Sequence, residues 1–137
     1  MTGTTITPYL DFSGRCEEAL EFYKKSVGAK VGMLMRWKDS PDKSMATPGN
    51  ADKVMHASFQ IGDSTVMASD GRNEGKPNFH GFALSISAPN EAEADEMFAA
   101  LSAGGQVTLA MTKTFFSPRF GMLTDKFGVG WMIIVGE

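Results

Sequence analysis

The sequence lacks several features that would place it in a specialised class of protein. Its one cysteine, Cys16, cannot form a disulfide within the chain and therefore favours a reducing cytoplasm. Its longest apolar run, around residues 131–135, is much shorter than a membrane span, and its first residues show no secretory signal. With 13 basic against 16 acidic side chains, it also lacks the basic excess of a general nucleic-acid binder. We therefore expect a cytoplasmic protein that binds neither membrane nor nucleic acid.

The composition is that of a folded globular protein. Of its 137 residues, 42% are hydrophobic and 21% are charged. A chain of this length can bury a core of its own, so neither disulfides nor structural zinc is required for stability. We predict one domain over residues 1–137.

The order of predicted elements occurs twice along the chain. Alternating apolar residues predict strands, and a helical spacing that ends at Gly28 predicts a helix, in the order strand 5–12, helix 16–27 and strands 29–37, 53–61 and 64–69. The second half repeats this order with strand 80–88, a helix with its apolar face over 94–101, and strands 106–113, 120–125 and 131–135. Two βαβββ modules, about residues 5–70 and 80–135, predict an α+β fold whose two sheets curl around a shared cavity.

Short local signals mark the ends of several elements. Gly62-Asp63 lies between two predicted strands and favours a tight hairpin turn, and Asn90 with Glu93 favours a capping box at the second helix. Pro8 cannot donate a hydrogen bond within a sheet, so it predicts an edge position or an irregular start for the first strand.

A series of motifs runs in a particular order over about residues 6–135. Those of the first half are Thr-Pro-Tyr-Leu at 7–10, Cys-Glu-Glu-Ala at 16–19, Phe-Tyr at 22–23, Ser-Asp-Gly at 69–71 and Gly-Lys-Pro at 75–77. Those of the second half are Gly-Gly-Gln-Val at 104–107, Thr-Phe-Phe at 114–116, Arg-Phe-Gly-Met at 119–122, Thr-Asp-Lys-Phe-Gly-Val at 124–129 and Trp-Met-Ile at 131–133. Together they resemble the PhnB-like proteins of the vicinal oxygen chelate superfamily, which includes glyoxalase I, extradiol dioxygenases and bleomycin-resistance proteins.

The resemblance implies two βαβββ modules in a cup-shaped mixed sheet, the glyoxalase/bleomycin resistance-like fold, often in a homodimer. It also implies that the ligand positions of metal-using relatives fall at or near Pro8, Gly81, Met132, and Ser69 or Asp70. Proline and glycine offer no side-chain donor, and methionine is too soft for hard divalent ions. His80 and Asp70 are then the remaining weak candidates, and two ligands do not close a site. We therefore predict no bound catalytic metal and no cofactor.

Some members of the family are described as demethylubiquinone methyltransferases. A nucleotide-type methyl donor would require a doubly wound domain with a glycine-rich turn between a strand and a helix. The nearest candidate turn, residues 128–130, runs into a predicted strand instead. We therefore predict that this description does not fit the chain.

Most of the ten methionines and ten phenylalanines are expected to fill the core. Those on a concave face could line a hydrophobic pocket, because flexible and polarisable side chains can pack around different ligands. His56 shares a predicted strand face with Ser58 and Gln60, where it could act as a general base or simply meet solvent. Cys16 lies on the apolar stripe of the first helix, which favours burial. The residues we predict to contact a ligand are Arg36, His56, Met67, Ser69, Asp70, Phe115, Phe116, Phe120, Met122 and Trp131.

Two functions are consistent with these residues. The first is a metal-independent small-molecule binding protein, which the missing metal ligands favour. The second is a metal-dependent enzyme of the superfamily, an isomerase, lyase or dioxygenase. In either case the expected partners are a small-molecule ligand and a second copy of the chain, because the sheet edges at Pro8 and near the chain ends need covering.

Overall fold

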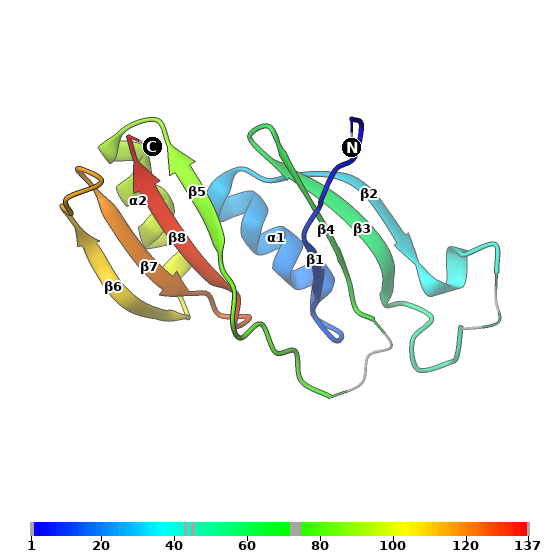
Figure 1. Cartoon of the computed structure of the whole chain (residues 1–137). Helices are drawn as coiled ribbons and strands as arrows, with labels where there is room; N and C mark the ends of the chain where they lie inside the picture. The colour runs from blue at the N-terminus through cyan, green and yellow to red at the C-terminus, as the bar shows by residue number, and fades with distance from the viewer. Residues whose placement is uncertain (1, 43, 45, 72–74, 137) are drawn as a thin grey trace. The chain divides into compact units, whose positions relative to one another are not determined.

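The computed structural model describes residues 2–42, 44, 46–71 and 75–136 (Figure 1). The chain divides into two units, Met1–Pro77 (unit 1) and Asn78–Glu137 (unit 2), and each is described by itself. No helix among the described residues is long and apolar enough to cross a membrane.

Unit 1 is a four-stranded sheet with one long helix against it (Figure 1). Its elements are β1 (Tyr9–Asp11), α1 (Cys16–Val27), β2 (Lys30–Arg36), the short 3-10 helix η1 (Trp37–Asp39), β3 (Val54–Ile61) and β4 (Ser64–Ser69). The strand order is β1-β4-β3-β2, with β1 parallel to β4 and the other pairs antiparallel. This is one βαβββ module.

The apolar stripe of α1 forms the core of unit 1 with one face of the sheet. Its buried side chains meet alternate residues of β1 and β3, such as Leu10 and Phe59, because successive side chains of a strand point to opposite faces. The Tyr23 and Phe59 rings stack with their centroids 5.8 Å apart. The helix ends where expected, at Gly28 in the left-handed conformation with φ 69°, because glycine has no Cβ to oppose it.

Unit 2 repeats this plan. Its elements are β5 (Leu84–Ala88), α2 (Glu91–Ser102), β6 (Gln106–Thr112), β7 (Phe120–Thr124) and β8 (Gly130–Val135). The strand order is β5-β8-β7-β6, and β5 is parallel to β8. The Asn90 side chain accepts a hydrogen bond from the Glu93 backbone N–H at 2.8 Å, which confirms the predicted cap at the start of α2. The Glu93 carboxylate accepts from the Asn90 side-chain amide at 2.8 Å, where a full capping box would use the Asn90 backbone N–H.

The α+β fold with two βαβββ units is therefore confirmed, and so is the hairpin turn at Gly62, which has φ 57°. Two strands are shorter than predicted by several residues. The first begins only at Tyr9, directly after Pro8, which has no N–H to donate. The strand predicted from residue 80 begins at Leu84, because Asn78 Oδ1 accepts the His80 N–H at 3.0 Å and holds this segment in a turn.

Candidate functional site

One face of the unit 1 sheet carries a histidine, a tyrosine, a serine and three methionines. Leu10, Ala57 and Phe59 are buried on the side of α1, so the residues between them belong to the other face. The register joins that face across the strands: Tyr9 pairs with Met67, Met67 and Met33 both pair with Ser58, and Met35 pairs with His56. We call Tyr9, Met33, Met35, His56, Ser58 and Met67 the open face of unit 1.

Tyr9 and His56 form a hydrogen-bonded pair on this open face. The Tyr9 Oη and His56 Nδ1 atoms are 3.1 Å apart, and the two ring centroids are 5.6 Å apart. Tyr9 is 49% exposed and His56 is partly exposed, so solvent and solutes can reach the pair. The hydrogen bond fixes the imidazole by Nδ1 and leaves Nε2 to donate to or accept from a bound molecule.

The Asp70 carboxylate has a structural role. Its Oδ1 accepts the backbone N–H groups of Gly14 and Cys16, each at 2.8 Å, and its Oδ2 accepts that of Val54 at 2.8 Å. Asp70 is 1% exposed, so these hydrogen bonds tie the beginning of α1 to the sheet in place of water. The neighbouring Ser69 is also buried, and its Oγ accepts the Gly71 N–H at 3.0 Å. Asp70 and Ser69 were both predicted to contact a ligand, and neither side chain is exposed in unit 1.

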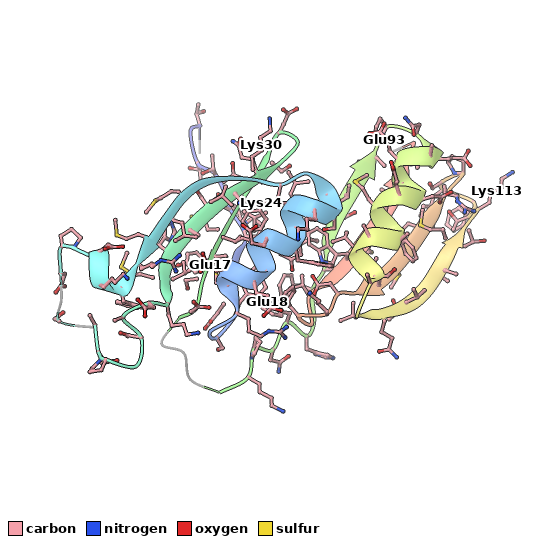
Figure 2. The ribbon with its side chains drawn as sticks, turned by 180° about the vertical axis from the view of Figure 1, so that it is seen from behind. Glu17, Glu18, Lys24, Lys30, Glu93 and Lys113 are labelled. Carbon is pink, nitrogen blue, oxygen red and sulfur yellow. The ribbon has the colours of Figure 1, made fainter. Side chains whose placement is uncertain are left out.

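Arg36 lies on the helix side of the sheet. Its guanidinium makes a forked ion pair with Glu17 of α1, with N–O distances of 3.1 and 2.8 Å, and it also donates to the Asp52 carbonyl at 2.9 Å. Figure 2 labels Glu17 on this helix. The hydrogen bond from Arg36 lowers the pKa of the Glu17 carboxyl. A bulge between Met35 and Arg36 precedes this position. The structure therefore does not bring Arg36 together with His56.

Unit 2 has a corresponding face. Gly121 of β7 faces α2, because a Cβ at this position would be 2.8 Å from Phe98 Cε2. Its neighbours in the strand, Phe120 and Met122, therefore point to the opposite face. Met122 pairs with Met132, and Met132 also pairs with Ser85. The pairing row of Tyr9, Met67 and Ser58 in unit 1 is thus matched by Ser85, Met132 and Met122 in unit 2.

The position of Trp131 corrects our expectation that it lines a concave face. It pairs with Leu123 on the α2 side of the sheet and is 2% exposed, so its ring belongs to the core of unit 2. Its indole N–H donates to Asp125 Oδ2 at 2.9 Å, which satisfies the polar atom of this buried side chain.

Three predicted ligand contacts form an aromatic cluster between β6 and β7. The Phe115–Phe116 and Phe116–Phe120 centroid distances are both 5.1 Å, with the rings edge to face. Phe115 is fully exposed and Phe116 is 43% exposed. The cluster is therefore an apolar surface of unit 2.

The residues at the metal positions that the resemblance implies do not fit a hard divalent ion. Pro8 and Gly81 have no side-chain donor, Met132 offers a thioether, and the Asp70 carboxylate is occupied by backbone N–H groups. His80 is exposed in a turn outside β5, which corrects the expectation that it lies on a strand. In the described part of the chain, no three His, Cys, Asp or Glu side chains gather as metal ligands would.

The Cys16 thiol is shielded from reaction at the start of α1. Burial, with a smaller contribution from the Asp70 charge, raises its pKa from 9.0 to about 12. We therefore expect iodoacetamide to modify Cys16 only after unfolding, because the nucleophile is the thiolate.

The raised pKa of Cys16 also means that the stability gained from the protonated thiol is complete below pH 9.0 and is lost as the pH rises toward about 12. Urea unfolding at alkaline pH, compared with Cys16→Ala, measures this loss; equal pH dependence of the two proteins would contradict it.

The topology of both units defines the class of the protein. Each is a βαβββ module of the glyoxalase/bleomycin resistance-like fold. A glyoxalase-related enzyme from Fulvimarina pelagi shares this fold at 17% identity and a TM-score of 0.66, with 98% of this chain and 88% of that chain covered.

The family follows from closer matches. A family model described as 3-demethylubiquinone-9 3-methyltransferase matches residues 4–134. Protein YjdN of Escherichia coli (strain K12) is 33% identical, over 95% of this chain and 94% of that protein. Protein PA1353 from Pseudomonas aeruginosa is 35% identical with a TM-score of 0.86, over 97% and 98% of the two chains. A PhnB protein from Bacillus cereus is 27% identical with a TM-score of 0.81, over 97% and 100%. The chain belongs to this PhnB-like family.

Proposed function

We propose that this protein is a metal-independent binding protein for a small organic molecule and that the open face of unit 1 forms part of its site. The Tyr9–His56 hydrogen bond carries the proposal, because it presents an oriented imidazole among thioether side chains. Ligand sites combine a mostly apolar lining with a few polar groups that fix orientation. Of the predicted contacts, His56 and Met67 lie on this open face, and Phe120 and Met122 lie on the corresponding face of unit 2.

The donor chemistry supports binding without a hard metal ion. The carboxylate that the sequence offered, Asp70, already accepts three backbone N–H groups. The same structure argues against methyl transfer, despite the description of the family. The turn at residues 128–130 joins the antiparallel strands β7 and β8, whereas a dinucleotide-type site needs a turn that opens a helix. A single buried thiol also supports our proposal of a cytoplasmic location.

The direct test is a thermal-shift screen with uncharged aromatic compounds that carry one hydrogen-bonding group. At about 100 times its Kd, a ligand should stabilise the folded protein by about 2.7 kcal/mol. We expect His56→Ala to weaken binding about tenfold, since a hydrogen bond to the ligand contributes about 1.4 kcal/mol. EDTA should leave the affinity of the wild-type protein unchanged.

The matched control is His80→Ala, which removes an exposed imidazole from the turn before β5. Its ligand affinity should equal that of the wild type in isothermal titration calorimetry. Loss of binding with EDTA, or equal affinity of His56→Ala and the wild type for every compound that binds, would refute the proposal.

We further propose that the protein is a homodimer in which the second copy covers the aromatic cluster of unit 2. The exposed Phe115 and Phe116 rings support this, because soluble monomers seldom expose adjoining aromatic side chains. Light scattering should give the dimer mass, and Phe115→Asp should shift the mass toward the monomer. Ile6→Asp, at an exposed apolar residue of unit 1, is the control and should remain dimeric. A monomer mass for the wild type across a wide concentration range would contradict the prediction.

A further inference from the structure

Three thioethers and an imidazole gather on the open face of unit 1. Met35 is the direct cross-strand partner of His56, and Met33 and Met67 lie on the two sides of Ser58. His56 and Ser58 are separated by one residue of β3, so they share a face. Four soft or borderline donors from three adjacent strands therefore surround the small side chain of Ser58.

The spacing suits a bound ion. Side chains directly opposite one another in a sheet have Cβ atoms about 4.5–5.5 Å apart. Methionine has three rotatable bonds beyond its Cα, so thioethers from neighbouring strands can converge above a small residue such as Ser58. Met33 is 41% exposed and the other three donors are partly exposed, which leaves them open to solutes.

We propose that Met33, Met35, Met67 and His56 bind a soft monovalent cation of the copper(I) class. Thioether ligands select such ions over magnesium, calcium or zinc, because a soft sulfur donor matches a soft acceptor. This goes beyond the binding of an organic molecule proposed above, and it concerns a different chemistry from the superfamily's hard-metal positions.

The Tyr9–His56 pair supports the proposal independently. Metal-binding histidines usually donate the N–H of their second ring nitrogen to a fixed acceptor, which orients the ring and sets its tautomer. Tyr9 Oη, 3.1 Å from Nδ1, accepts such a hydrogen bond when the His56 tautomer carries its proton on Nδ1. Donation from Nδ1 places the lone pair on Nε2, the nitrogen that remains for the ion.

The test uses Ag(I) as a redox-inert probe, added to the full-length protein in chloride-free buffer. With ¹³C-methyl methionine labelling, one equivalent of Ag(I) should shift the methyl signals of Met33, Met35 and Met67. The Met97 signal, from α2, should not move. Titration calorimetry should give a stoichiometry of one, and Zn(II) should not compete for the ion.

Variants identify the ligands. Met35→Leu and His56→Phe should each weaken Ag(I) binding at least tenfold, whereas Met97→Leu and Cys16→Ala should leave it unchanged. Leucine keeps the apolar volume of methionine, so Met35→Leu removes the sulfur donor with little change in packing. Binding of the organic ligand is measured with the wild-type protein in buffer without Ag(I), because the proposed function requires no metal ion. That separates failure of this inference from failure of the proposed function. Unchanged Ag(I) affinity in Met35→Leu, or loss of binding in Cys16→Ala, would overturn the metal site.

Discussion

Replacing Asp70 with alanine is expected to destabilise the protein by about 4 kcal/mol, because it leaves three buried backbone N–H groups without an acceptor. Two of these groups lie at the start of α1 and one at the start of β3, so the change loosens the helix from the sheet. Asp70→Asn should lose less, since its amide oxygen can still accept from Gly14 and Cys16 while its NH₂ group faces the Val54 N–H. Urea denaturation measures the free energy of unfolding of both variants.

The matched control for this prediction is Asp63→Ala, which removes an exposed carboxylate from the turn between β3 and β4. A surface substitution of this kind should change the free energy of unfolding by less than about 0.5 kcal/mol. If Asp70→Ala were as stable as Asp63→Ala, the structural role of the Asp70 carboxylate would be wrong.

Asp70 also shows why sequence reasoning misplaced part of the candidate site. A carboxylate beside a predicted strand is a reasonable metal or ligand contact, and the sequence does not show that backbone N–H groups occupy it. Asp125 is a second case: it is buried, and it accepts from the backbone of Phe127 at 2.8 Å and Val129 at 3.1 Å as well as from Trp131. Acids of this kind are distinguished from ligands only when their hydrogen-bond partners are known.

Features that depend on local spacing were predictable. The end of α1 at Gly28, the cap at Asn90 and the turn at Gly62 each follow from a few adjacent residues. The faces of β3 were predictable too, because strand alternation alone separates the buried Ala57 from His56.

Contacts that depend on the register between strands far apart in the sequence were not predictable. The pairing of Tyr9 with His56 spans 47 residues and requires β1 to lie parallel to β4. Alternation alone also left open which face of β8 meets α2, so Trp131 was placed on the wrong one. The one available signal for the open face was that His56 shares its strand face with Ser58.

The second large effect is expected at Gly105, where β6 approaches the end of β7. A Cβ at this position would be 2.8 Å from the Asp125 carbonyl carbon and 2.9 Å from its Cα, and it would also overlap the Thr124 carbonyl oxygen. These are backbone atoms, so no side chain can rotate to make room. Gly105→Ala should therefore destabilise the protein by roughly 3 kcal/mol, at the upper end of overpacking costs.

The size of this effect follows from what Asp125 holds. Displacing its backbone would strain the hydrogen bonds of its carboxylate to Phe127, Val129 and the Trp131 indole, so unit 2 cannot easily yield. Gly49→Ala is the control, because a Cβ there meets only Thr47 Oγ1 at 3.8 Å, an ordinary contact. Urea unfolding followed by tryptophan fluorescence should show a lower midpoint for Gly105→Ala and little change for Gly49→Ala. Equal midpoints for the two variants would contradict the prediction, because they would mean that the backbone at Gly105 can move away from Asp125 at little cost.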